Sequence, residues 1–158
     1  MINIRHNVFE TNSSSVHSIV ISKEGLEENK IKIARRKRMG DYGKFLIVKL
    51  GRFGNEMEDF MNQEEKLSYL VTIAYIKDGG YDIENTYDSY AFRNMESELK
   101  EYCKCDGIFI DPTSEKDAYI DHQTIEDYWS MSDFPKRMGL DYKDFIFNRF
   151  VSLHTDSD

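Results

Sequence analysis

The segment that most constrains the fold is residues 63–77, because signals for both ends of a helix stand in the sequence itself. Asn62 can cap the first turn, and Glu65, three residues later, completes a capping box. Gly79 and Gly80 follow as a stop signal. Apolar residues recur inside the segment at helical spacing, at Leu67, Leu70, Val71 and Ala74. The sequence therefore predicts an amphipathic helix here.

Short segments with a period of two predict strands. Residues 2–9 and 16–22 alternate and are separated by the polar connection 10–15, which predicts a hairpin. A firmer strand is predicted between Gly43 and Gly51. Further short strands are predicted at residues 31–33, 107–111 and 118–122, and the last two are expected to pair with each other.

The remaining segments complete the predicted architecture. A second main helix is expected over residues 88–104, and a short one opens at Thr124 and ends near Met131. Residues 142–153 fit either period, and we favour a helix at the front and a strand at the back. The prediction is an α+β fold: a single domain over residues 1–158, with a mostly antiparallel sheet and two main helices.

Composition excludes several classes of protein. The 158 residues carry a net charge of -8, which excludes a uniformly basic nucleic-acid binder but allows a local basic patch. No apolar run approaches the ~18 residues of a membrane span, so no membrane partner is expected. Only two cysteines, Cys103 and Cys105, exclude a disulfide scaffold and a four-cysteine zinc site. We expect a cytoplasmic protein, with no cofactor and no metal.

Charge is unevenly distributed along the chain. Residues 1–52 hold 11 Lys and Arg against 5 Asp and Glu, whereas residues 53–158 hold 10 against 24. Many of the acidic residues stand beside tyrosines. One interpretation is an ordinary solvated surface. The other is an acidic, tyrosine-rich face that docks on a positively charged partner.

Much of the positive excess is one run, Arg35, Arg36, Lys37 and Arg38. Four adjacent cations could contact phosphates of a nucleotide or RNA, with an affinity that falls steeply with salt. No aromatic residue is interleaved within the run to stack on bases, which a single-strand binder would favour. A solvated basic loop is therefore the favoured interpretation.

Residues 5–18 read Arg-His-Asn-Val-Phe-Glu-Thr-Asn-Ser-Ser-Ser-Val-His-Ser. This segment resembles the N-terminus of a group of small, uncharacterised proteins of bacteriophages and low-GC Gram-positive bacteria, approximately R-x-x-V-F-E-T-N-S-S-S-x-H-S. Residues 119–123, 145–148 and 155–158 also look like that group. The resemblance implies a phage or mobile-element origin. Because phage accessory proteins of this size are often inhibitors of host defence, it favours that role by analogy.

The Ser-rich connection is a candidate ligand site. Its hydroxyls, amide and turn N–H groups could bind an oxyanion or phosphate, with Arg5 and His17 beside it. The candidate phosphate-binding residues are Arg5, Thr11, Asn12, Ser13, Ser14 and Ser15. The competing interpretation is a loop whose side chains satisfy their own backbone, as Ser, Thr and Asn commonly do. No Gly-Lys-Ser/Thr follows, which excludes a Walker A site.

Asp121 and His122 end a predicted strand and form, with His17, the candidate catalytic set. Neighbours on a strand point to opposite faces, which favours a structural role for at least one of the pair. If they share a site, His17 and His122 must open into one cleft. Two further pairs, Cys103 with Cys105 and Glu96 with Glu98, are interpreted as structural.

Two functions are carried forward from the sequence. The first is a phage-type accessory protein that acts by binding, as an inhibitor of a host nucleic-acid-targeting defence complex. Its partner would be a host protein or ribonucleoprotein complex, because an acidic surface can occupy a cationic channel. The alternative is a nucleotide- or phosphate-binding protein, or an enzyme, built on the Ser-rich loop and the histidines.

Overall fold

The structure, a computed structural model, describes residues 4–10, 15–21, 25–53, 58–60, 62–120 and 132–157. Side chains are described for residues 25–53, 62–120 and 132–151. The strands are β1 (Ile4–Glu10), β2 (Ser15–Ile21), β3 (Ile33–Arg38), β4 (Asp41–Val48), β5 (Arg52–Phe53), β6 (Glu58–Phe60), β7 (Gly107–Ile110), β8 (Tyr119–Ile120) and β9 (Ser152–Ser157). The α-helices are α1 (Gln63–Ile73), α2 (Ile83–Asp88), α3 (Tyr90–Cys103), α5 (Phe134–Arg137) and α6 (Tyr142–Phe147).

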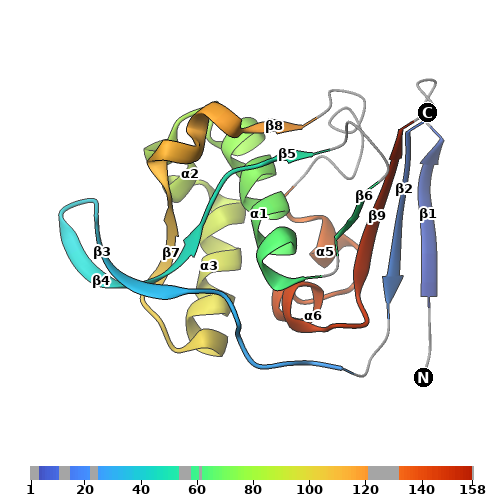
Figure 1. The fold of residues 1–158 in the computed structure, drawn as a ribbon, viewed down its shortest axis with the longest axis horizontal. Coiled ribbons are helices and arrows are strands. Elements are labelled where there is room, and N and C mark those ends of the chain that lie inside the picture. The colour runs from blue at the N-terminus through green and yellow to red at the C-terminus, as the bar shows by residue number, and fades with distance from the viewer. Residues whose placement is uncertain are drawn as a thin grey trace.

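The strands form three sheets, with orders β1-β2-β9-β6, β3-β4-β7 and β5-β8. Four of the six pairings in the described part of the chain are antiparallel, so the sheet content is mostly antiparallel as predicted. Figure 1 shows helices in the middle of the molecule and the four-stranded sheet along one side. The β3–β4 hairpin projects from the opposite side. The predicted α+β class is confirmed.

The N-terminal hairpin is confirmed as an antiparallel pair of β1 and β2, with Ile4 opposite Ile21. The register shifts between Asn7 and Phe9, as at a β-bulge. β2 then pairs with β9, so the two ends of the described chain share one sheet. The connection at residues 11–14 lies outside the described residues.

Helix α1 begins and ends as its sequence signals predict. The side chain of Asn62 accepts a hydrogen bond from the Glu65 N–H at 2.8 Å, which satisfies a donor of the first turn. After Ile73 the helix continues as a π-helical turn, Ala74–Asp78, which is capped by Gly79.

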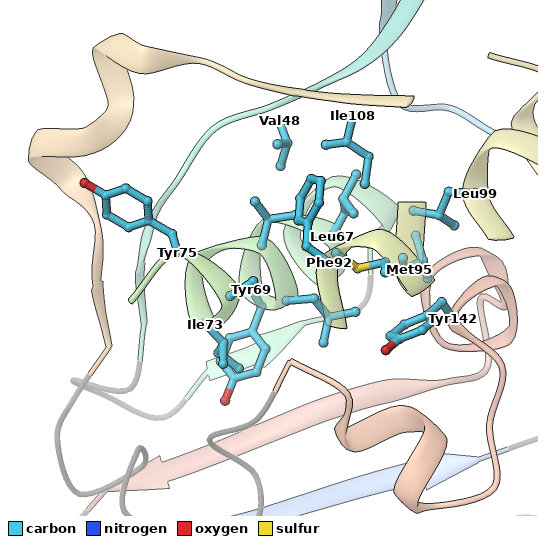
Figure 2. Close-up of a cluster of buried hydrophobic side chains, with 14 of the residues drawn as sticks. Val48, Leu67, Tyr69, Ile73, Tyr75, Phe92, Met95, Leu99, Ile108 and Tyr142 are labelled. Carbon is cyan, nitrogen blue, oxygen red and sulfur yellow. The ribbon is translucent and has the colours of Figure 1, made fainter. Parts of the chain in front are cut away.

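The core lies between α1, α3 and the sheet of β4 and β7. Figure 2 shows Leu67 and Phe92 close together, with Val48 and Ile108 from the strands beside them. Leu67, Phe92 and Ile108 are fully buried. Met95 and Leu99 of α3 are also inaccessible to solvent.

The predicted pairing of residues 107–111 with 118–122 is wrong. β7 pairs in parallel with β4, and β8 pairs in parallel with β5. The connection is the reason: Asp111 caps a 3-10 helix, Pro112–Asp117, which leads the chain away from β7 where a hairpin would need a tight turn. Ser114 on that helix accepts from the Leu50 N–H and holds it beside β5.

The second main helix is α3, and it is preceded by a short helix, α2, that the sequence pattern did not reveal. Ser89 separates the two with extended backbone. For residues 142–153 the favoured interpretation is confirmed, with α6 in front and β9 behind. The predicted helix at 124–131 lies outside the described residues. Within the described residues, none of the helices has the length and apolar character that crossing a membrane requires.

Candidate nucleic-acid interface

The basic run lies on a strand. Residues 35–38 belong to β3, which pairs with β4 through the two-residue turn Met39-Gly40. Both turn residues have positive φ, 50° and 93°, as a type I′ hairpin turn requires. The run therefore lies on a strand and not in the expected loop, although Arg35, Arg36 and Lys37 are exposed as expected. The turn was missed because Met takes the place where Asn or Asp is the usual signal.

The strand divides the run between two faces, because successive side chains point to opposite sides of a sheet. Arg35 and Lys37 lie on one face, and Arg36 and Arg38 on the other. β3 has a hydrogen-bonded neighbour on one side only, β4, in the described sheet.

The first face carries an aromatic ring beside its cations. The hairpin register places Tyr42 opposite Lys37, and Lys44 opposite Arg35. The Arg35 guanidinium carbon lies 5.4 Å from the centre of the Tyr42 ring, and the Lys37 Nζ lies 5.6 Å from it. Tyr42 is nevertheless 66% exposed. We call these four residues, Arg35, Lys37, Tyr42 and Lys44, the cationic hairpin face.

Arg38 has a different role. Its Nη1 donates to Glu96 Oε2 and to the Ile108 carbonyl, the latter at 3.0 Å, and its Nη2 lies 3.3 Å from Glu96 Oε1. The guanidinium carbon lies 3.8 Å from the centre of the Tyr87 ring. The side chains of Arg38 and Glu96 are only 13% and 14% exposed. Arg38 therefore anchors the hairpin to α3 and β7 and is not available to a ligand.

Arg36 remains exposed on the second face and lines a groove of about 620 Å³ together with Lys32 and Lys49. Asp111 lies in the same groove. Hydrogen bonds from Thr113 lower the pKa of the Asp111 carboxyl, and Lys49 and Arg36 act in the same direction. Acidic side chains of α1 also line this groove, so its charge is balanced, unlike that of the cationic hairpin face.

The other predicted site residues are placed only in part. Arg5 lies on β1 opposite Val20, and His17 lies on β2 opposite Thr155 of β9; Ser15 begins β2. The predicted loop and strand-end residues Thr11, Asn12, Ser13, Ser14, Asp121 and His122 lie outside the described residues. The shared cleft of His17 and His122 therefore stays a prediction.

The two cysteines are free and half-buried. Burial, with the neighbouring Cys105 thiol, raises the pKa of Cys103 to about 12, so this thiol stays protonated at neutral pH. Among the described residues, no group of three His, Cys, Asp or Glu is arranged to hold a metal ion. Glu98, like Glu96, is engaged within the fold: it lies 2.9 Å from Lys136 Nζ.

The fold and this face together define an α+β protein with a projecting, positively charged hairpin that displays one aromatic ring. Sequence reasoning missed Tyr42 because the ring comes from the opposite strand, and only the hairpin register brings it beside the cations. No family model, curated protein or solved structure matches the chain.

Proposed function

We propose that the protein acts by binding, and that the cationic hairpin face binds single-stranded nucleic acid. The observation that carries this proposal is the exposed Tyr42 ring, which lies within about 6 Å of the charged groups of Arg35 and Lys37 on an element that projects from the body of the protein. Single-strand binders combine these two features, cations for the phosphates and aromatic rings for the bases.

The two kinds of side chain contribute differently. Stacking of one base on an aromatic ring is worth about 1–3 kcal/mol, whatever the base. Each phosphate that a Lys or Arg neutralises releases a counterion from the nucleic acid. Three cations on this face give an expected slope of log affinity against log salt of about -2 for a single strand.

The rest of the chain supports binding at the hairpin rather than over the whole surface. Residues 53–158 carry 10 Lys and Arg against 24 Asp and Glu, so most of the protein repels a polyanion. A ligand therefore gains affinity at the projecting hairpin and loses it elsewhere. This charge distribution also favours a short nucleic-acid segment bound at the hairpin over a long one that would run across the acidic surface.

The first test measures the contribution of the ring. A fluorescently labelled single-stranded RNA or DNA of about ten nucleotides is titrated with the protein, and anisotropy reports binding. Tyr42→Ala should weaken binding by about 1–3 kcal/mol. Tyr90→Ala is the matched control, because Tyr90 is 82% exposed and belongs to α3, not to the cationic hairpin face. Equal affinity for Tyr42→Ala and wild type would refute a stacking role.

The second test measures the contribution of charge. Raising salt about fourfold should lower wild-type affinity about twentyfold, and the triple variant Arg35→Gln, Lys37→Gln, Lys44→Gln should lose most of this dependence. A control triple variant replaces three exposed lysines outside the hairpin, Lys77, Lys100 and Lys116. Tighter binding to duplex than to single strands would contradict the proposal, since a two-stranded ribbon can also enter a major groove.

The expected role as an inhibitor of a host nucleic-acid-targeting complex stays part of the proposal. A hairpin that binds nucleic acid is one route by which such a protein could reach a ribonucleoprotein. Capture of host proteins on the wild-type chain, with and without nuclease, tests this role: partners lost on nuclease treatment and with Tyr42→Ala would support it. Capture of no host protein at low salt would refute it.

A further inference from the structure

A second site lies away from the cationic hairpin face, in a cavity of about 450 Å³ between the start of α1 and the end of α6. Ile146 and Phe147 give it an apolar wall. Three cations line it, Lys30, Lys66 and Arg149, against two carboxylates, Glu27 and Glu64. This volume falls in the range of small-molecule sites.

Lys66 is the unusual member of the lining. The residue is 1% exposed, and its Nζ donates to the carbonyls of Asn148 at 3.0 Å and Val151 at 2.9 Å. An ammonium has three N–H groups, so one of them has no protein acceptor among the described residues. No described carboxylate lies within 4 Å of this nitrogen, although buried charges are normally paired.

The two carboxylates do not cancel the three cations. Glu27 Oε2 lies 2.7 Å from Lys30 Nζ, so this acid is already engaged by one of them. Arg149 makes no ion pair with a described residue, and its guanidinium carbon lies 4.6 Å from the centre of the Phe150 ring. Lys66 and Arg149 therefore have no ion pair with a described carboxylate: Glu27 acts on them only at longer range, and the exposed Glu64 lines the same cavity.

We propose that this cavity binds a small organic anion, a phosphate monoester or carboxylate with an apolar body. Its anionic oxygens accept from the third Lys66 N–H and from the Arg149 guanidinium, which is suited to bidentate contact. Its apolar body packs against Ile146 and Phe147. Such a ligand supplies the direct ion pair that no described carboxylate makes with Lys66.

Phenyl phosphate and benzoate are the probes, with phenol as the neutral control, each titrated into the full chain by calorimetry. At least one anion should bind saturably, and phenol should not. Arg149→Gln changes an exposed side chain and should weaken binding at least tenfold. Lys66→Met should do the same if the variant folds.

The hairpin triple variant Arg35→Gln, Lys37→Gln, Lys44→Gln separates this site from the proposed nucleic-acid interface. It should bind the anion within about twofold of wild type, because none of its three positions lines the cavity. Unchanged affinity in Arg149→Gln, or no saturable binding of either anion at about 10 mM, would overturn the proposal. Loss of anion binding in the hairpin variant would also overturn it.

Discussion

Arg38 and Lys66 are both withdrawn from solvent, but the protein compensates their charges in different ways. Arg38 faces the Glu96 carboxylate, the Ile108 carbonyl and the Tyr87 ring. Lys66 faces two carbonyls, and its Nζ lies 5.9 Å from the centre of the Phe145 ring. The first cation is neutralised inside the fold; the second is solvated by dipoles but keeps its net charge.

The difference separates two uses of a buried cation. A buried pair with good geometry fixes two elements together, but it is costly to break because the remaining charge is left uncompensated. A buried cation without an acid is easier to deprotonate, and burial lowers the pKa of Lys66 to about 8 although Glu27 opposes the shift. Arg38 thus fits a structural role, and Lys66 fits a site that accepts charge from outside.

The largest effect is expected for Arg38→Met. This change leaves Glu96, whose side chain is only 14% exposed, without its cation, and removal of one partner from a buried pair costs about 3–5 kcal/mol. The free energy of unfolding, measured in urea, is the readout. Arg35→Met is the matched control on the same strand, where an exposed side chain should change stability by no more than about 0.5 kcal/mol.

The double variant Arg38→Met, Glu96→Gln sharpens the result. In the wild type the Ile108 N–H donates to the Glu96 carboxylate at 2.9 Å. The amide of Glu96→Gln still has an oxygen that can accept this hydrogen bond, but it carries no charge. The double variant should therefore be more stable than Arg38→Met alone. An Arg38→Met variant no less stable than Arg35→Met would show that the ion pair does not anchor the hairpin.

The next effect is expected for Gly107→Ala, which disturbs the same pair through the backbone. Gly107 has φ +141°, and an added Cβ would lie 2.7 Å from Glu96 Oε2 and 3.1 Å from Arg38 Nη1. Strain and the displaced carboxylate together should cost about 2–3 kcal/mol, measured by urea unfolding. Gly40→Ala, at φ +93° with no atom within 4 Å of its Cβ, carries only the strain, about 1 kcal/mol. Equal costs for the two variants would contradict the close packing of the pair.

The sequence predicted the parts of the fold whose signals are local. The capping residues of α1 and the alternation of β1 and β2 act within a few residues, so short windows contain them. The partners of β7 and β8 were wrong because a strand's own composition does not state which distant strand it joins. Partner choice is decided by packing between segments far apart in sequence.

Prediction of the sites was limited in the same way: the sequence revealed local signals but not contacts between distant residues. The basic run was visible in the sequence, but its division into three exposed cations and a largely buried Arg38 depends on the fold and on Glu96, 58 residues away. Lys66 had a weaker local signal, since it stands four residues before Leu70 and shares its side of α1. Nothing in that spacing distinguishes a buried lysine from one that extends to solvent.

A third prediction tests the pKa of Lys66 directly. The pKa falls from 10.5 in the unfolded chain to about 8 in the folded protein, so the unfolded state binds more protons between these values. Below about pH 8 the buried charge destabilises the folded protein by its full amount. As pH rises from about 8 to 10.5 this destabilisation is lost, so the free energy of unfolding increases. Between about pH 7 and 10, wild type should gain roughly 2 kcal/mol relative to Lys66→Met.

The prediction concerns the difference in stability between wild type and Lys66→Met, because other groups also titrate in this pH range. Burial raises the pKa values of Tyr142 and Cys103, which lowers the stability of both proteins as pH rises. Those contributions cancel between wild type and Lys66→Met. A pH-independent difference would show that Lys66 keeps an ordinary pKa and that the carbonyls compensate its charge fully.

The smallest effect is expected for Arg93→Gln, which supplies the solvated end of the comparison. Arg93 Nη2 lies 3.2 Å from Asp88 Oδ1, and the two side chains are 63% and 60% exposed. Water already solvates both charges, so the pair gains little from contact and should change the free energy of unfolding by no more than about 0.5 kcal/mol. Added salt should reduce even this difference, because exposed charges are screened. A loss in urea unfolding as large as that of Arg38→Met would show that burial is not what distinguishes the charges of this protein.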